Sequence, residues 1–366
     1  MKLKRLQNKL LIFAFFLLLL TPTLDYVFSF SPIKDLFEKR LPVVKPQPPS
    51  SYADLKLYPR AFENFFNDNY GFRKTLIFLN SQMTDKIFDV SPDARAVVGK
   101  DGWFYFDNHN SLLDATGKAL ISDDLVERGV ESFYRNWKNM RAKNIDYLLV
   151  IAADKSTIYP EFLPDYVKPS EPHRIDKFLT ALRKKYPDFP VLDLRPLLKK
   201  AKENEIIYHK TDTHWNMRGA HYAYIEIAKR LKIKPHLRND FYDKEDAEFL
   251  GDISDIMNSK AASIDYNLEP KFKIKSTQNA IPESGKNFHR PNFFSNEDKS
   301  LPRIFVYKDS YFANLSGLVS EHFSQSIYVN EFPCDLNYEI IKNFSPNVVI
   351  QEFWEGRVEV VLNQCK

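Results

Sequence analysis

The strongest hydrophobic signal in the chain lies at its N-terminus. Four basic residues within the first nine positions precede an apolar run from Leu10 to Leu20, and Asp25 marks its end. This is the pattern of an export signal, either a cleaved signal peptide or an uncleaved anchor whose basic end stays in the cytoplasm. Tyr26 and Phe28 follow where small residues would mark a cleavage site. We therefore predict that residues 1–30 are a signal anchor in the cytoplasmic membrane and that the rest of the chain is periplasmic or otherwise extracytoplasmic.

A proline-rich stretch separates this segment from the rest of the chain. Residues 41–51 contain four prolines in eleven positions, a composition that favours an extended spacer. We predict a tether over residues 31–54. From Tyr58 to Leu79, aromatic and charged residues alternate at roughly helical spacing, which indicates an amphipathic helical hairpin.

The remaining chain alternates between short apolar runs and longer amphipathic stretches. The expected strands are 97–106 (a strand or hairpin), 147–152, 191–194, 303–307 and 347–351, and the expected helices are 111–143, 172–185 and one capped by Asn216. Strands that alternate with helices predict an α/β domain over residues 55–366, with a mostly parallel sheet flanked by helices. Residues 235–300 lack long apolar periods, so we expect an insertion there.

Composition narrows the classes of function. Hydrophobic residues make up 44% of the 366 residues and charged residues 27%, which is ordinary for a globular protein. A net charge of +4 is too small to favour nucleic-acid binding, which needs a clustered basic face. Cys334 and Cys365 are the only two cysteines, and an oxidising compartment would permit a disulfide between them. We predict no metal site and no nucleotide cofactor, because the sequence has no Cys/His cluster and no phosphate-binding motif.

Reactive side chains lie where the predicted strands end. In an open α/β sheet, ligands gather beyond the carboxyl ends of the strands. Ser310 follows the strand predicted at 303–307, and Asp212 and His214 lie just ahead of a predicted helix. A serine hydroxyl is a poor nucleophile near neutral pH and needs a base that a third group orients. His214 could take the Ser310 proton, with Asp212 accepting from the other ring nitrogen.

Structural roles compete with these catalytic ones. A serine after a strand is most often a helix cap, and an Asp-x-His pair at a loop edge commonly satisfies turn backbone or binds a metal. Lys155, Tyr311 and Arg357 are candidates for lining the site or stabilising an oxyanion. For Arg357, a salt bridge with Glu352 or Glu355 is the favoured role.

Several segments resemble one known family. YHKTDTHWNMRGAHYAY at 208–224 is similar to the signature of the alginate O-acetyltransferase family (AlgJ/AlgX-like, DHHW) of SGNH-hydrolase-like proteins. Five further segments resemble the family's blocks in the same order: YPRAFENFFNDNYGFRKTLI at 58–77, VGKDGWFYF at 98–106, ADKSTIYPEFLP at 153–164, GDISDIM at 251–257 and YKDSYF at 307–312. The resemblance covers roughly residues 55–360.

The resemblance implies a permuted SGNH-hydrolase-like fold and a set of roles. Carried over by motif, Ser310 is the nucleophile, His214 the general base and Asp212 its orienting partner. The chain order Asp, His, Ser is the reverse of ordinary SGNH esterases, and triads are recognised by geometry. Lys308 stands where those esterases carry glycine, so the oxyanion donor is open. The backbone N–H of Ser310 or Tyr311 is the first candidate.

The resemblance also implies a reaction. Ser310 would accept an acetyl group, and a sugar hydroxyl activated by His214 would remove it, giving an O-acetylated extracytoplasmic polysaccharide or glycan. Because acetyl-CoA is cytoplasmic, a membrane-bound O-acyltransferase would supply the acetyl group. Two alternatives remain: a carbohydrate acetylesterase that uses the same triad with water as acceptor, and a non-catalytic glycan-binding or scaffold subunit of a modification complex.

Overall fold

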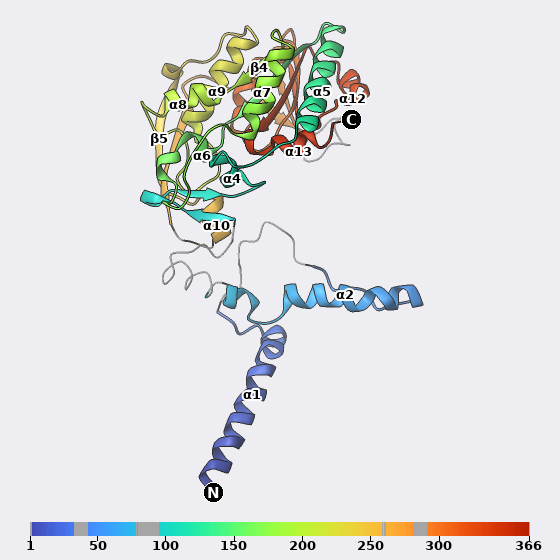
Figure 1. Ribbon diagram of the computed structural model, residues 1–366, viewed down its shortest axis with the longest axis vertical. Coiled ribbons are helices and arrows are strands. Elements are labelled where there is room, and N and C mark those ends of the chain that lie inside the picture. Colours follow the sequence, from blue (N-terminus) through green and yellow to red (C-terminus); the bar gives the residue numbers. More distant parts are fainter. Residues whose placement is uncertain are drawn as a thin grey trace. The chain divides into compact units, whose positions relative to one another are not determined.

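The computed structural model describes residues 2–32, 43–77, 79, 95–257, 259, 261–280 and 291–365. The chain divides into two compact units (Figure 1). The first comprises Met1–Ala94 and Ser254–Lys260, and the second comprises Arg95–Ile253 and Ala261–Lys366.

The first unit contains two long helices. α1 (Lys2–Phe28) includes Gln7–Phe28, a segment of 22 residues with a mean hydropathy of 2.1 that can cross a membrane by length and composition. α2 (Tyr52–Asn69) begins after Ser51, whose hydroxyl accepts a hydrogen bond from the Asp54 backbone N–H. This cap satisfies one of the free donors at the start of the helix.

The predicted tether and hairpin correspond only in part to these elements. Residues 43–50 are neither helix nor strand, while 33–42 lie outside the described residues. α2 already begins inside the predicted tether. The chain then turns at 70–72 and is helical again from residue 73, but most of this predicted second helix lies outside the described residues.

A seven-stranded sheet forms the centre of the second unit. In spatial order its strands are β4 (Val191–Asp193), β3 (Asp146–Ala152), β11 (Val348–Trp354), β9 (Arg303–Tyr307), β10 (Gln325–Val329), β8 (Asn292–Asn296) and β7 (Ser276–Asn279). The first five strands are parallel to one another, whereas β8 and β7 are antiparallel to their neighbours. The predicted α/β fold with a mostly parallel sheet is confirmed.

Helices cover both faces of this sheet (Figure 1). One face carries α5 (Asp123–Arg141), α7 (Arg174–Lys185), α12 (Tyr338–Phe344) and α13 (Val358–Leu362), and the other carries α8 (Arg195–Ala201), α9 (Met217–Arg230) and α11 (Ala313–Ser320). Alternate side chains of β3 point to opposite faces. Leu149 and Ile151 pack in the first layer, and Leu148 and Val150 in the second. A strand buried on both faces needs apolar residues at every position, which explains the unbroken run in β3.

Shorter elements complete the second unit. β1 (Ala96–Val98) and β2 (Phe104–Phe106) form an antiparallel hairpin, as predicted for this segment. β5 (Phe241–Phe249) and β6 (Ser263–Pro270) form a separate two-stranded sheet. Its remaining short helices are η1 (Lys100–Gly102), α4 (Ser111–Ala115), α6 (Lys155–Ile158), η2 (Pro160–Phe162), η3 (Arg238–Asp240) and η5 (Glu355–Arg357). A further short helix, α10 (Asp252–Met257), has residues in both units.

The segment 235–300 is only partly an insertion. Its strands β5 and β6 lie apart from the main sheet, but β7 and β8 extend the edge of that sheet. Most residues of these two strands are polar. Each of these strands at the end of the sheet has only one buried residue, so its sequence lacks the apolar run on which the prediction of strands relied.

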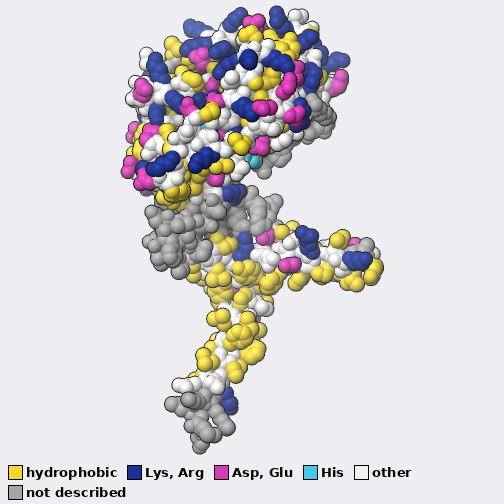
Figure 2. Space-filling view, viewed as in Figure 1, with side chains coloured by type: hydrophobic (Ala, Val, Ile, Leu, Met, Phe, Trp, Pro, Cys, Tyr) yellow, Lys and Arg dark blue, Asp and Glu magenta, His cyan; other side chains and the backbone are white. Residues whose placement is uncertain are grey.

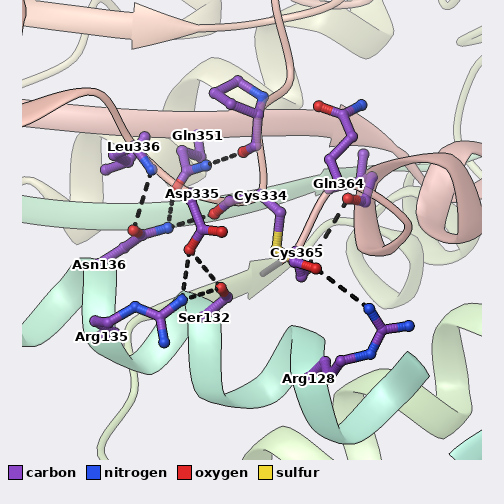
Figure 3. Close-up of a disulfide and its surroundings, with 12 residues drawn as sticks. Arg128, Ser132, Arg135, Asn136, Cys334, Asp335, Leu336, Gln351, Gln364 and Cys365 are labelled. Atoms are coloured by element: carbon purple, nitrogen blue, oxygen red, sulfur yellow. Dashed lines mark hydrogen bonds and ion pairs between the residues drawn. A yellow bond between two sulfur atoms is a disulfide. The ribbon is translucent and has the colours of Figure 1, made fainter. Parts of the chain in front are cut away.

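A disulfide joins Cys334 to Cys365, whose Cα atoms are 5.0 Å apart (Figure 3). Helix α5 supports both cysteines. The Asn136 side chain donates to the Cys334 carbonyl at 2.7 Å, and Arg128 donates to the Cys365 carbonyl at 3.3 Å. The loop that the bond closes contains α12, β11 and α13.

Candidate active site

The three predicted catalytic residues come from two loops. β9 ends at Tyr307, and Ser310 lies in the short connection from β9 to α11. Asp212 and His214 lie in the loop that leads into α9. This helix starts where predicted, because the Asn216 side chain accepts hydrogen bonds from two backbone N–H groups of the first turn.

His214 lies between the other two residues. Its Nε2 is 2.7 Å from Ser310 Oγ, and its Nδ1 is 2.7 Å from Asp212 Oδ1. The same carboxylate oxygen accepts the His214 backbone N–H at 2.9 Å. The structure thus brings together three residues that span 98 positions of sequence, since Asp212 precedes His214 by 2 and His214 precedes Ser310 by 96. Ser310 is exposed, while the other two side chains are mostly buried.

Asp212 and His214 each stabilise the charged form of the other. Burial raises the pKa of Asp212, but the hydrogen bond and positive charge of His214 outweigh it and hold this pKa below its ordinary value. Burial lowers the pKa of His214, yet the hydrogen bond and charge of Asp212, aided by Asp252 and Asp309, raise it overall. A carboxylate that stays ionised beside an imidazole stabilises the imidazolium that forms when the imidazole accepts a proton.

Lys155 does not line the surface at Ser310. Its side chain is buried, and Nζ donates to the backbone carbonyls of His209 at 3.2 Å, Lys210 at 3.1 Å and Asp212 at 2.6 Å. Burial lowers the pKa of Lys155 to about 8, with neighbouring carboxylates opposing the shift. Contrary to the prediction, this ammonium holds the backbone of the loop that carries Asp212.

A second segment holds the same loop from another side. Asp252 Oδ1 accepts the Thr213 backbone N–H at 2.8 Å, and Asp212 Oδ2 accepts the Asp252 backbone N–H at 2.8 Å. Next to it, a Cβ on Gly251 would lie 2.3 Å from the Thr211 carbonyl carbon and oxygen, so only glycine fits there. Neither Gly251 nor Asp252 was among the predicted site residues. The one sequence signal for them was the resemblance of GDISDIM to a family block.

Tyr311 connects the serine loop to the histidine loop. Its hydroxyl donates to the Thr213 carbonyl at 3.0 Å, and its carbonyl accepts the Trp215 indole N–H at 3.1 Å. Its backbone N–H donates to Asp309 Oδ1 at 2.9 Å, so it is not available to an oxyanion. Within the described part of the chain, the Ser310 N–H has no acceptor. Of the two predicted oxyanion donors, Ser310 N–H is therefore the one left.

Arg357 makes neither of the salt bridges predicted for it. Its guanidinium lies over the Phe332 ring, 4.2 Å from the centroid. Within the described ranges, Glu355 pairs instead with Arg195 at 3.4 Å. Burial raises the pKa of Glu352 well above its ordinary value. Both glutamates are buried. Arg357 stacks on the Phe332 ring instead of pairing with either of them.

Three side chains near the serine have the composition of a cation site. Ligand atoms of Asp212, His214 and Asp252 all lie within 4.8 Å of one another. Each residue already takes part in hydrogen bonds: the His214 ring bonds to Asp212, and both carboxylates accept backbone N–H groups. A cation bound through His214 Nδ1 would have to displace its bond to Asp212. The arrangement fits a hydrogen-bonded network better than a metal centre.

Known proteins match this chain in sequence. A family model, the SGNH hydrolase-like domain of acetyltransferase AlgX, matches residues 96–271. The probable alginate O-acetylase AlgJ of Pseudomonas syringae pv. tomato is 24% identical over 319 residues, which cover 81% of this chain and 78% of that protein. The protein of the same name from Pseudomonas aeruginosa is 29% identical over 137 residues, or 37% of this chain, and the match spans only 32% of that relative's length.

Solved structures match the fold. Bacillus cereus PatB1 with a sulfonyl adduct has a TM-score of 0.56 at 14% identity, covering 74% of this chain and 98% of that one. A DHHW family protein from Eubacterium siraeum has a TM-score of 0.51 at 15% identity, covering 73% and 97%. The mostly parallel sheet, with Ser310 just beyond β9, defines an SGNH hydrolase-like protein. The sequence matches then indicate a similar group within this class: residues 96–271 match the SGNH hydrolase-like domain of acetyltransferase AlgX, and the chain is similar to AlgJ proteins.

Proposed function

We propose that the protein is an O-acetyltransferase that acetylates hydroxyls of an extracytoplasmic polysaccharide, with Ser310, His214 and Asp212 as its catalytic triad. One observation carries the proposal: the His214 ring is 2.7 Å from Ser310 Oγ on one side and 2.7 Å from Asp212 Oδ1 on the other. The match of residues 96–271 to the acetyltransferase AlgX domain and the similarity to probable alginate O-acetylases support acetyl transfer and a polysaccharide acceptor.

In the first half of the reaction, Ser310 becomes acetylated. Its Oγ attacks the carbonyl carbon of the acetyl donor while the hydroxyl proton moves to His214 Nε2. The Ser310 backbone N–H donates to the oxyanion that forms. The bond between the acetyl carbon and the leaving group then breaks, and the leaving group takes the proton from Nε2.

In the second half, a sugar hydroxyl removes the acetyl group. His214 Nε2 accepts the proton of this hydroxyl as its oxygen attacks the acetyl carbon. The bond between Ser310 Oγ and the acetyl carbon breaks, and Oγ takes the proton back from Nε2. Asp212 stays ionised throughout and holds the imidazole through Nδ1.

The proposal includes a location and a donor. We propose that α1 remains attached as a membrane anchor and that the second unit works outside the cytoplasm, where a membrane-bound O-acyltransferase delivers the acetyl group. The exposure of Ser310 suits a polymeric acceptor, which could not enter an enclosed pocket. The same exposure gives water access, so hydrolysis is the competing reaction.

Intact-protein mass spectrometry after exposure to p-nitrophenyl acetate tests the chemistry. We expect a mass increase of one acetyl group that maps to Ser310, disappears in Ser310→Ala and is strongly reduced in His214→Ala. Ser170 is an exposed serine outside the triad, so Ser170→Ala is the matched control and should be labelled like the wild type. Acetylation elsewhere, with Ser310 unmodified, would disprove the triad.

A second stage identifies the acceptor. When polysaccharide is added to the acetylated protein, transfer of the acetyl group to the polysaccharide supports the acetyltransferase. Release of acetate alone would indicate an acetylesterase. If cells carrying Ser310→Ala still acetylate their polysaccharide at the normal level while truncation of the chain abolishes acetylation, the protein is a scaffold subunit.

A further inference from the structure

Helix α2 has one apolar and one polar face. On a helical projection, six apolar residues share one arc, and charged or amide residues occupy the opposite arc. The apolar arc comprises Tyr52, Leu55, Tyr58, Phe62, Phe65 and Phe66, and the polar arc comprises Lys56, Arg60, Glu63, Asn64, Asn67 and Asp68. Leu57 is an exception on the polar side, and Asn69, the last residue of the helix, is an exception on the apolar side.

Four of the six residues of the apolar arc are exposed, and Tyr58 and Phe65 are half-buried. Leu55 is 55% exposed, Phe62 41% and Phe66 52%. The aromatic rings contact one another along the helix, with Tyr58 stacked on Phe62 at 6.1 Å between centroids. Figure 2 shows hydrophobic side chains along both α1 and α2. A continuous apolar patch of this kind marks a surface that another apolar phase covers.

The C-terminal end of α2 lies against the C-terminal end of α1. The Asp25 carboxylate, near the end of α1, accepts the Ser31 backbone N–H at 2.6 Å and the Phe72 backbone N–H at 2.7 Å. A Cβ on Gly71 would lie 2.0 Å from the Pro22 carbonyl oxygen. The chain therefore leaves α2 in direct contact with the last turns of the apolar segment.

We propose that α2 lies along the membrane surface at the end of α1, with its apolar arc at the boundary between head groups and acyl chains. This inference rests on the proposed anchoring by α1. We assign lipid to the arc because the contacts of Asp25 and Gly71 place the end of α2 against the last turns of α1, whose apolar side chains are also exposed. An 18-residue helix extends roughly 27 Å, so α2 would form a long in-plane contact.

The charged residues of α2 indicate which interaction with lipid would hold the helix at the membrane. The helix has two basic residues, Lys56 and Arg60, and three acidic ones, Asp54, Glu63 and Asp68. It therefore gains no net attraction to anionic lipids, and burial of apolar side chains must supply the binding. We expect the same depth of insertion in zwitterionic and in anionic bilayers.

Spin labelling of the full chain in liposomes of phosphatidylethanolamine and phosphatidylglycerol tests this arrangement. Single cysteines are introduced by Leu55→Cys or Phe62→Cys on the apolar arc, and by Glu63→Cys or Asn67→Cys on the polar arc. The native cysteines are bonded to each other, so only the new thiol reacts. Labels at 55 and 62 should lie roughly 5–10 Å below the phosphates, accessible to oxygen and shielded from a water-soluble nickel reagent. Labels at 63 and 67 should show the reverse.

A label introduced by Leu18→Cys reports on α1 separately. If that label lies deep in the bilayer while all four α2 labels are equally accessible to nickel, the inference for α2 is wrong and the anchor stands. If the label at 18 is also in water, the anchoring proposal and this inference fail together. Labels at 55 and 62 that are shielded from both oxygen and nickel would show that protein covers the arc, which overturns the assignment to lipid.

Discussion

Gly251→Ala adds one methyl group at the backbone of the loop that carries Asp212 and His214. In the native structure the new Cβ would lie 2.3 Å from the Thr211 carbonyl carbon and oxygen and 2.4 Å from the Asp212 nitrogen, whereas ordinary contacts begin at 3.4 Å. The neighbouring atoms all belong to the backbone, so no side chain can rotate away. One of the two segments must move by about 1 Å, the difference between 2.3 and 3.4 Å.

That displacement disturbs three hydrogen bonds between the segments. The Ile253 N–H donates to the Thr211 carbonyl at 3.1 Å, the Asp252 N–H to Asp212 Oδ2 at 2.8 Å, and the Thr213 N–H to Asp252 Oδ1 at 2.8 Å. Overpacking of this kind costs about 1–3 kcal/mol of unfolding free energy. A misplacement of 1 Å in a catalytic group costs about 100-fold in rate. We therefore expect Ser310 acetylation to slow by about two orders of magnitude.

The measurements are the rate of acetyl-adduct formation with p-nitrophenyl acetate and the free energy of unfolding in urea. Gly317→Ala in α11 is the matched control, because nothing lies within 4 Å of its Cβ. It should keep the wild-type rate and gain about 0.5–1 kcal/mol from its better helix propensity. If Gly251→Ala also forms the adduct at the wild-type rate, close packing at Gly251 does not position the triad.

Three further predictions concern other parts of the structure. Lys155→Met removes the ammonium that holds three carbonyls. Urea unfolding should show a loss of about 1–3 kcal/mol, and the slowed adduct formation should recover partly in Lys155→Arg. Adduct formation should slow as pH falls through a value above the ordinary histidine pKa, because Asp212 raises the pKa of His214 and the base becomes protonated. Asp212→Asn should shift this limb to lower pH, and an unchanged pH–rate profile would exclude His214 as the base. Reduction of the disulfide opens a loop with a sequence separation of 31 and should cost about 3–4 kcal/mol in urea unfolding; equal midpoints with and without reductant would contradict this.

The sequence predicted those features that depend on neighbouring residues. The strands β3 and β9 are apolar at nearly every position because both faces of the sheet are covered, and this pattern is visible in the sequence itself. Asn216 caps α9 through contacts two and three residues away. Asp212 and His214 are close together in the sequence, so both fall within one segment that shows the family resemblance.

Contacts between residues that lie far apart in the sequence could not be predicted from local sequence patterns. The Lys155 ammonium binds carbonyls 54 to 57 residues further along the chain, and the Tyr311 hydroxyl binds one 98 residues earlier. Nothing local to either residue indicates these partners, so both were named as candidates for lining the site or stabilising an oxyanion. The strands β7 and β8 at one end of the sheet were missed because their sequences lack an apolar run, although backbone pairing with neighbouring strands places them in the sheet.

The ring closed by Cys334 and Cys365 contains β11, the strand that pairs with both β3 and β9. In a reducing cytoplasm this ring stays open, so the middle of the sheet lacks its covalent constraint. For a chain exported as we propose, the bond forms only after translocation, when the unfolded state loses entropy and the sheet gains stability. Oxidation would then favour the folded enzyme in the compartment where its substrate is found.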